Sequence, residues 1–381
     1  MGFLKYLIYI LFVGLLLTAG CATSKIKTPY HRDDKAYSGF GKTPGREFYT
    51  DHDITDSVSL KWQNDANGGF TNSSVVVYDS LVFINDLSGR IYCYNIMTGK
   101  QVGQLKNSGA VFSSPFINRY LVIYAVAADK ENITYLKYYD YDRGDLVKEI
   151  ELAGRCQTEI IGTDDAVVFN TEDGNVYKYD LKGDKMWKVE TNSTVHCSPS
   201  MNEDVIIFGN DNGEIIGIRN KDGKILYRKK IGESFFCGTS VSGNLAYTGN
   251  DNGNLYAIDL NNGDVKWKFS SGAKIIMTPS VTPAEIYFGN LSGDLFCLDK
   301  IDGRLIWKTS TGGVLNATPY IANNLLVVPD LNNKFYFVNR NNGEITNTYP
   351  VEGKNKLSPL IFRNLLFIGY DRGELQAYEF K

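Results

Sequence analysis

Short runs of alternating hydrophobic and polar residues recur along residues 59–381. Within one such unit, residues 254–259 place every second side chain on the same face, which is the period of a pleated strand. Turn sequences rich in Gly, Asn and Asp bound this run, and no stretch carries a convincing helical stripe. The unit predicts four short strands, at 235–241, 244–248, 254–259 and 264–269.

The unit repeats about every 40 residues. The segments 209–227, 249–267 and 289–307 share one frame, and 329–347 follows it more loosely. The shared turn position falls at Gly89, Gly174, Gly213, Gly253, Gly293, Asn333 and Gly373. The last six positions are 39 or 40 residues apart, and the 85 residues before them leave room for two units, which predicts eight units in all. A small four-stranded sheet must stack on neighbours to cover its faces, so each unit is typical of a propeller blade.

The two ends of the repeat region complement each other. The eighth unit ends at Lys381 after its third strand, and residues 59–64, which include Trp62, precede the first inner strand. Pairing that strand with the last unit closes the ring and removes a free sheet edge. The sequence therefore predicts an all-β fold, an eight-bladed β-propeller of four-stranded antiparallel blades at 59–381, closed by an N-terminal strand in the last blade.

The first twenty residues are predicted to be a targeting segment. Lys5 precedes the apolar run 6–17, which is short for a transmembrane helix, and small residues then lead to Cys21. This order resembles a bacterial lipobox, which implies a signal peptide at 1–20 and diacylation of Cys21. By resemblance to enteric sorting signals, Ala22 implies the outer membrane in a cell that has one. An ordinary signal peptide with an unrelated cysteine and an uncleaved anchor are the alternatives.

Residues 21–58 are predicted to form a lipidated N-terminus and a flexible tether. They are polar, interrupted by Pro and Gly, and show no periodicity. As a random coil they would span about 30 Å on average. This length would hold the propeller clear of a lipid surface.

Charge and cysteine content exclude two classes of protein. The net charge is −3 and no long basic run is present, so a nucleic-acid partner is not expected. After Cys21 the cysteines are Cys93, Cys156, Cys197, Cys237 and Cys297. Five thiols cannot all pair within one chain, and they show neither CxxC nor metal-ligand spacing. The sequence predicts neither a disulfide scaffold nor a metal site.

A turn glycine followed four residues later by tryptophan resembles the quinoprotein-type, PQQ-like propeller repeat. The spacing occurs at Gly183/Trp187, Gly263/Trp267 and Gly303/Trp307, and the place of the Trp is taken elsewhere by Gly103, Lys148, Tyr227 and Asn347. In this repeat type the tryptophan docks between neighbouring blades. The resemblance thus implies a structural docking role for Trp62, Trp187, Trp267 and Trp307.

Two families share this repeat: quinone-dependent alcohol and sugar dehydrogenases, and BamB-like lipoproteins that assist outer-membrane β-barrel assembly. A lipobox, a short tether and eight compact blades resemble the second. That resemblance implies a non-enzymatic, monomeric scaffold without a cofactor, anchored in the outer membrane and facing the periplasm, with protein partners that include the barrel-assembly machinery. The loops at 191–195, 230–234 and 270–274, where that family contacts its partner, are short here, so no partner-contact residue is transferred.

Candidate catalytic residues are scarce. His196 is the only histidine of the repeat region, so no Ser-His-Asp or Cys-His arrangement is predicted. Its neighbour Cys197 leaves a catalytic or metal-binding pair open, against a packed or hydrated channel residue. Cys156, Cys197 and Cys237 are aligned at one repeat position, which we interpret as a packing slot rather than a ring of functional thiols. The Asn-Asp-Asn-Gly runs at 210–213 and 250–253 are interpreted as turns rather than calcium loops.

Two other functions remain as alternatives. A quinone-dependent dehydrogenase would need the vicinal cysteines typical of that family, and the sequence has none. A glycan- or cell-wall-binding propeller would need exposed aromatic residues, for which Tyr135, Tyr138, Tyr139 and Tyr141 are the candidates. Ordinary packing of these tyrosines is the competing interpretation. No catalytic, cofactor-binding or metal site is predicted.

Overall fold

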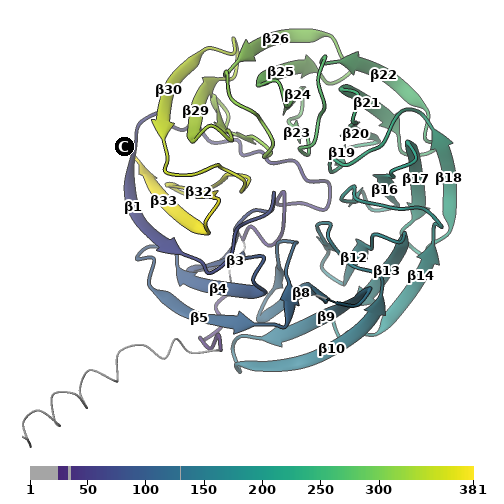
Figure 1. The fold of residues 1–381 in the computed structure, drawn as a ribbon, viewed down its shortest axis with the longest axis vertical. Coiled ribbons are helices and arrows are strands. Elements are labelled where there is room, and N and C mark those ends of the chain that lie inside the picture. Colours follow the sequence, from purple (N-terminus) through teal and green to yellow (C-terminus); the bar gives the residue numbers. More distant parts are fainter. Residues whose placement is uncertain (1–24, 33–35, 129) are drawn as a thin grey trace, which may run out of the picture.

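The computed structural model describes residues 25–32, 36–128 and 130–381. Across these residues, 33 strands form eight sheets around one axis (Figure 1). The predicted signal peptide at 1–20 and the predicted lipidation site Cys21 lie outside the described residues. In the part of the chain that is described, no helix is long and apolar enough to cross a lipid bilayer.

The first four blades follow the chain in order. Blade 1 consists of β2 (Val76–Tyr78), β3 (Leu81–Asn85), β4 (Arg90–Asn95) and β5 (Gln101–Lys106). Blade 2 consists of β6 (Gly109–Ala110), β7 (Phe116–Asn118), β8 (Leu121–Ala128), β9 (Ile133–Asp140) and β10 (Asp145–Ala153). Blade 3 consists of β11 (Ile161–Gly162), β12 (Ala166–Asn170), β13 (Asn175–Asp180) and β14 (Lys185–Glu190). Blade 4 consists of β15 (Ser200–Met201), β16 (Val205–Gly209), β17 (Glu214–Arg219) and β18 (Ile225–Lys230).

The last four blades complete the ring. Blade 5 consists of β19 (Ser240–Ser242), β20 (Leu245–Gly249), β21 (Asn254–Asp259) and β22 (Val265–Ser270). Blade 6 consists of β23 (Ser280–Val281), β24 (Glu285–Gly289), β25 (Asp294–Asp299) and β26 (Leu305–Ser310). Blade 7 consists of β27 (Tyr320–Ile321), β28 (Leu325–Pro329), β29 (Lys334–Asn339) and β30 (Ile345–Pro350). Blade 8 consists of β31 (Leu360–Phe362), β32 (Leu365–Tyr370), β33 (Glu374–Phe380) and β1 (Val58–Asp65).

The predicted eight blades and their closure are confirmed. β1 pairs antiparallel with β33, and Trp62 lies opposite Ala377. Blade 2 departs from the four-stranded pattern because β6 and β7 both pair with β8. Its β8, β9 and β10 contain 8, 8 and 9 residues, longer than their counterparts in the other units, which explains why the repeat is hard to recognise there.

Burial differs between the middle and the outer strands of a blade. All five residues of β16 are buried, because neighbouring blades cover both faces of the middle strands. β18, the outer strand of the same blade, alternates between exposed and less exposed residues because one face meets solvent. The period-2 pattern in the sequence is therefore clearest in the outer strands, and the middle strands carry the apolar core.

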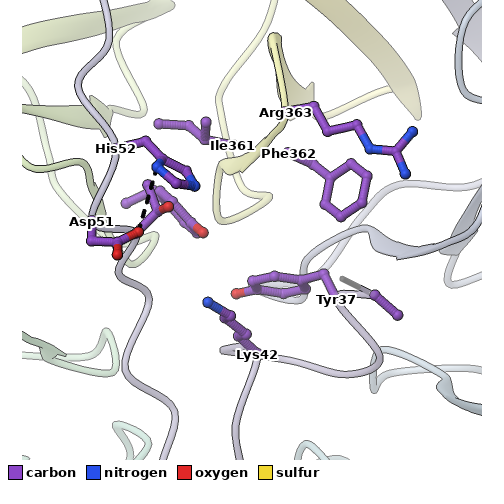
Figure 2. Close-up of a pocket in the computed structure, with 10 residues that line it drawn as sticks. Tyr37, Lys42, Asp51, His52, Ile361, Phe362 and Arg363 are labelled. Atoms are coloured by element: carbon purple, nitrogen blue, oxygen red, sulfur yellow. Dashed lines mark ion pairs between the residues drawn. The ribbon is translucent and has the colours of Figure 1, made fainter. Parts of the chain in front are cut away.

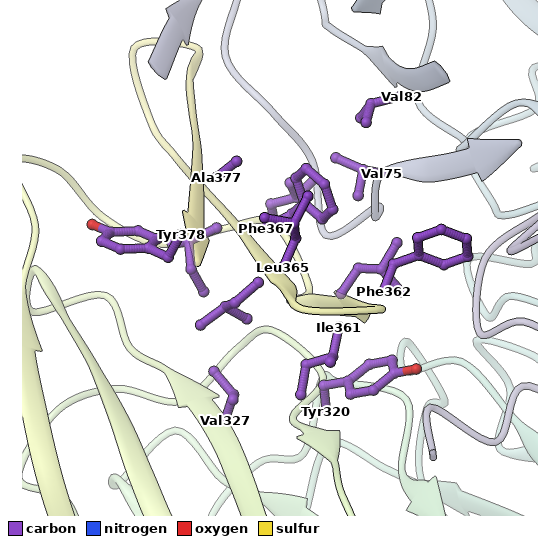
Figure 3. Close-up of a cluster of buried hydrophobic side chains, with 14 of the residues drawn as sticks. Val75, Val82, Tyr320, Val327, Ile361, Phe362, Leu365, Phe367, Ala377 and Tyr378 are labelled. Atoms are coloured by element: carbon purple, nitrogen blue, oxygen red, sulfur yellow. The ribbon is translucent and has the colours of Figure 1, made fainter. Parts of the chain in front are cut away.

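The largest apolar cluster seals the ring where the chain's two ends meet. It joins residues of blades 7, 8 and 1, among them Val327, Phe367 and Val82 (Figure 3). Phe40 and Phe48, which precede the propeller in the sequence, belong to the same cluster. The N-terminal segment is thus part of the core at the closing seam.

The described part of residues 21–58 differs from the flexible tether expected from the sequence. Ile26, Tyr37, Phe40 and Phe48 are at most 6% exposed. Residues 25–32 lie against the rim of blades 1 and 2, and residues 36–54, here called the plug, cross the ring to blade 7 (Figure 1). The physical reason is that backbone groups of the propeller hydrogen-bond with the segment's backbone, while its apolar side chains are buried against the blades. Neither kind of contact requires a periodic sequence pattern.

Candidate functional site

Consecutive blades are joined where an outer strand meets a turn of the next blade. Each indole Nε1–H donates to a backbone carbonyl of the following blade: Trp62 to Ile96 at 2.9 Å, Trp187 to Asn220 at 2.9 Å, Trp267 to Lys300 at 3.2 Å and Trp307 to Arg340 at 2.8 Å. Three residues after each carbonyl stands a glycine whose added Cβ would lie within 3.0 Å of the indole: Gly99, Gly223, Gly303 and Gly343. The structure therefore places the four tryptophans between neighbouring blades.

Blade 1 has Gly103 where other blades have tryptophan, and the N-terminal segment fills the slot. The Thr28 N–H donates to the Tyr141 carbonyl at 3.0 Å, in the position that receives an indole N–H in other joints. The Lys27 side chain covers Gly144, the turn glycine of that joint. A Cβ at Gly103 would meet the Lys25 carbonyl at 2.1 Å, so the main chain occupies the space of the absent indole.

The tyrosines of blade 2 do not form an exposed aromatic surface. Tyr138, Tyr139 and Tyr141 are 1%, 5% and 1% exposed, and Tyr135 is half-buried. The Tyr139 hydroxyl donates to the Ile26 carbonyl at 2.8 Å, which helps hold the N-terminal segment. Of the two interpretations of the sequence, packing is confirmed for Tyr138, Tyr139 and Tyr141, because the longer strands of blade 2 pack these rings inward or beneath the segment, and they offer no exposed face to a glycan.

The plug is bound largely through its backbone. In the described chain, the inner strands of six blades donate an N–H to it from the same register position: Val77, Ile117, Met201, Val241, Val281 and Ile321. The acceptors are carbonyls of the plug, at donor–acceptor distances of 2.7 to 3.1 Å. Tyr37 and Thr50 return N–H bonds to the carbonyls of Val77 and Ile321. The six N–H groups therefore form a ring around the channel, and this ring binds the carbonyls of a segment that turns at residues 39–45.

Three residues before that register position, the eight inner strands form a ring across the channel, here called the girdle. Its members are Ser74, Ser114, Glu159, Ser198, Gly238, Thr278, Thr318 and Ser358. Neighbours touch: Ser74 N donates to Ser114 Oγ at 3.0 Å, and Glu159 N donates to Ser198 Oγ at 3.0 Å. Of these eight described positions, only Glu159 carries a charge.

Arg46 of the plug contacts Glu159 of the girdle. Arg46 is 1% exposed, and its Nη2 donates to the Glu159 backbone carbonyl at 2.9 Å. The Glu159 carboxylate accepts from Ser114 N at 2.8 Å. Burial raises the pKa of Glu159 to about 7, against the opposing effects of Arg46 and Ser114. Burial lowers the pKa of Arg46 to about 10, opposed by Glu159. The guanidinium also lies 5.3 Å from the ring centre of Phe40.

The alignment of Cys156 with Cys197 and Cys237 is wrong. Cys197 and Cys237 each accept the N–H of a residue twelve positions later, at 3.3 Å and 2.9 Å. In blade 3 the residue twelve before Asn170 is Thr158, which bonds Asn170. Thr158 is therefore the blade 3 equivalent of Cys197 and Cys237. Glu159 then stands at the next position, where most other blades have Ser or Thr, and this exception to the repeat could have identified the girdle carboxylate from the sequence.

His196 lies at the channel mouth opposite the plug. Its Nδ1 is 2.9 Å from the Asp211 carboxylate, its Nε2 is 3.5 Å from that of Glu172, and its ring packs on Phe236 at 5.5 Å. Cys197 is buried separately, so the two neighbours form no pair. Among the residues that the structure describes, no group of three or more His, Cys, Asp or Glu side chains could hold a metal ion.

The five described cysteines are buried free thiols. Burial raises the pKa of Cys156, Cys237 and Cys297 to about 12. A thiol becomes nucleophilic as the thiolate, so these groups pack as small apolar side chains rather than react.

The two Asn-Asp-Asn-Gly runs form turns. Asn210 Oδ1 accepts the N–H groups of Asn212 at 3.0 Å and Glu214 at 2.9 Å, and Asn250 Oδ1 accepts that of Asn254 at 2.9 Å. Their amide oxygens are therefore engaged with the local backbone, as turn chemistry requires.

Several cavities border the plug in the described part of the chain. One of about 590 Å³ lies between Tyr37 and Lys42 of the plug and Phe362 and Arg363 of blade 8 (Figure 2). A second of about 650 Å³ lies on the side of blades 1 to 3. A third, of about 210 Å³, is at the opposite mouth of the channel and is lined by Phe40 and His196 among others. The plug thus crosses the channel without filling the face on which it lies.

Comparisons with known proteins agree with this architecture. A family model described as outer membrane protein assembly factor BamB matches residues 56–269 and 251–381. Among curated proteins, none matches the sequence. A similar solved structure is BamB from Moraxella catarrhalis, which is 15% identical, covers 85% of this chain and 100% of its own, and has a TM-score of 0.71.

Dehydrogenases share the same fold. The quinohemoprotein alcohol dehydrogenase ADHIIG from Pseudomonas putida HK5 is 11% identical, with a TM-score of 0.79, and covers 91% of this chain and 80% of its own. A europium-containing methanol dehydrogenase is 10% identical, has a TM-score of 0.74, and covers 91% of this chain and 98% of its own. Likeness at these identities concerns the propeller alone. Since the family model matches almost the whole repeat region, the chain belongs to the family of the outer membrane protein assembly factor BamB.

Proposed function

We propose that this chain is a non-enzymatic envelope lipoprotein that binds protein partners, as a monomeric scaffold in outer-membrane β-barrel assembly. The observation that carries the proposal is the family match over residues 56–269 and 251–381. The sequence around Cys21 supports a lipid anchor, which would place the protein at the outer membrane facing the periplasm.

The outer strands offer a rigid surface for such partners. They end each sheet with unpaired backbone groups, and apolar side chains are exposed along them, such as Leu226 at 39%, Val265 at 39% and Ile306 at 41%. Edges of this kind can accept a strand from another protein. The short loops at 191–195, 230–234 and 270–274 are fixed by backbone bonds to the neighbouring turn of their own blade, so they offer a second, preorganised face.

The lipid anchor would lie close to the propeller. Lys25 already contacts blade 1 at Gly103. Four residue steps from Cys21 to Lys25 span at most about 14 Å when fully extended. We infer that the rim of blades 1 and 2 faces the membrane, instead of the whole propeller being held clear of it by a long tether.

Affinity capture tests the proposed function. The tagged full chain is recovered from detergent-solubilised envelope, with an unrelated tagged lipoprotein as the control. We expect components of the barrel-assembly machinery to be enriched over the control. Recovery of no such component would remove the barrel-assembly role, and a Cys21→Ala chain that still partitions with the membrane would remove the lipid anchor.

A dehydrogenase is the second candidate, because solved quinohemoprotein alcohol dehydrogenases share the fold. The plug argues against it: Phe40 and Arg46 occupy the channel with the protein's own side chains. Vicinal cysteines, which that family carries, do not occur in the sequence. Incubation with pyrroloquinoline quinone and Ca²⁺ followed by dye-linked alcohol oxidation distinguishes the two, and turnover would favour the dehydrogenase.

A further inference from the structure

The channel face that holds the plug has the features of a peptide-binding site. Six inner strands donate their N–H groups to plug carbonyls, and these contacts involve no plug side chain. When a peptide is held through its main-chain carbonyls, these bonds supply affinity for any sequence and the side-chain pockets supply specificity. The ring of N–H groups can therefore accept other peptides that carry suitable side chains.

The side-chain pocket of this site holds a guanidinium beside an aromatic ring and provides a backbone acceptor for it, the Glu159 carbonyl. Within the described chain, the girdle position is a serine, a threonine or a glycine in seven blades. In blade 3 it is Glu159. Arg46 fills the space next to Glu159, and Phe40 lies against the same guanidinium. A buried carboxylate favours a partner that brings a positive charge and N–H donors, because its burial without one is costly.

The plug fits this site imperfectly. Lys42, Arg46 and Phe48 adopt positive φ angles of 73°, 60° and 52°, which residues with a Cβ rarely adopt. Tyr37 Oη, Thr43 Oγ1 and Arg46 Nη1 are buried without a hydrogen-bond partner. The hollows of about 590 and 650 Å³ on either side leave room for a longer occupant. A segment without these defects would bind the same ring of N–H groups more favourably.

We propose that the plug face of the channel is a peptide-binding site that residues 36–54 occupy in cis and that a segment of a partner protein, carrying an arginine near an aromatic residue, occupies in trans. The identity of the partner rests on the proposed scaffold function, whereas peptide binding itself does not. The plug then acts as a resident competitor, and the apparent affinity for the partner segment rises in proportion to the fraction of chains in which the plug is displaced.

A labelled peptide of residues 36–54 tests the site by fluorescence polarisation. The receptor is the full chain with Arg46→Ala, which weakens the plug, and the full chain with Lys42→Ala is the matched control because Lys42 is exposed. We expect the peptide to bind the Arg46→Ala chain about tenfold or more tightly than the wild-type or Lys42→Ala chain. A peptide that itself carries Arg46→Ala should bind about tenfold more weakly than the unchanged peptide.

A second receptor locates the specificity. In the Arg46→Ala chain that also carries Glu159→Ser, the difference in affinity between the two peptides should shrink, because the carboxylate is gone while the backbone carbonyl that accepts from Arg46 Nη2 remains. Lack of saturable binding to a folded Arg46→Ala chain, or equal affinity of the two peptides for it, overturns the proposal. If circular dichroism shows that this chain does not fold, a wild-type chain with a protease site inserted at the exposed residues 51–53 and cut after folding takes its place. The peptide can bind whether or not affinity capture recovers barrel-assembly components, so failure of either proposal is seen separately.

Discussion

The Trp267 indole packs directly on Gly303, so the joint between blades 5 and 6 has no room for a side chain at that turn. A Cβ at Gly303 would lie 2.6 Å from the indole, whereas one at Gly312 would meet nothing within 4 Å, although φ is 72° and 73° at the two glycines. We expect Gly303→Ala to lower the free energy of unfolding by about 1–3 kcal/mol more than Gly312→Ala does. Urea unfolding of both variants measures the difference, and equal losses would show that the joint tolerates a side chain.

Glu159 makes stability depend on pH between about 4.5 and 7. Its pKa rises from 4.5 to about 7 on folding because the carboxyl is buried. The folded state therefore favours the protonated form: the stabilisation is fully present below pH 4.5 and is lost as the pH rises through 7. This shift corresponds to about 3 kcal/mol. We expect wild type to lose about that much stability between pH 4.5 and 8 relative to Glu159→Gln.

Denaturant unfolding of both proteins across this pH range provides the measurement. Comparing two variants of one chain removes the contribution of the other titrating groups. Glu203→Gln, which changes an exposed glutamate, is the control and should follow wild type at every pH. If the Glu159→Gln and wild-type curves stay parallel, Glu159 titrates no differently in the folded protein than in the unfolded one.

At the scale of elements, alternation and turn chemistry predict the strands and fail on the plug. Residues 254–259 form β21 with the expected bounds, because turn residues precede and follow the strand; five of its six residues are buried, so the strand shows no alternation in burial. The plug has no such repeat: Phe40, Arg46 and Phe48 pack on one another in the channel although their spacing follows no strand or helix period. Blade 3 shows a related limit. When the strand pairing is not known, the sequence aligns Cys156 instead of Thr158 with Cys197 and Cys237. Glu159 is then not recognised as a member of the girdle.

The N-terminal segment substitutes for a missing tryptophan, which predicts that a tryptophan can displace it. In Gly103→Trp the new indole competes with Lys27 and the Thr28 N–H for the turn at Gly144. We expect residues 25–32 to leave the rim, so that trypsin cleaves after Lys25 and Lys27 several-fold faster than in wild type. Mass spectrometry of the early digestion products measures this.

Tyr227→Trp is the control for that experiment. Tyr227 already packs its ring on Gly263 in the joint between blades 4 and 5, away from the N-terminal segment. This variant should be cleaved like wild type. Unchanged cleavage in Gly103→Trp would mean that residues 25–28 hold the slot more firmly than an indole does.

At the scale of the whole molecule, ring closure makes one of the eight blades different from the others. Seven blades are built from consecutive strands, whereas blade 8 takes β1 from before blade 1. The length of the repeat region and the incomplete last unit were enough to predict this arrangement, because the last unit lacks an outer strand and β1 pairs with the edge that β33 would otherwise leave open. Blade 8 is consequently held by contacts between residues more than 300 positions apart, such as Trp62 and Ala377.

Trp62 and Trp307 make equivalent joints, yet only Trp62 belongs to the strand that closes the ring. Both are 8% exposed and donate to a carbonyl of the next blade, and Trp62 also packs on Phe367 of its own blade. We expect either change to alanine to cost about 3–5 kcal/mol. In Trp62→Ala, amide hydrogen exchange should accelerate along β33, because β1 separates and exposes that edge. In Trp307→Ala, β33 should keep its wild-type exchange rate, since β1 remains paired. Equal protection of β33 in the two variants would show that the seam is no weaker than the other joints, and that the ring opens with equal ease between any two blades.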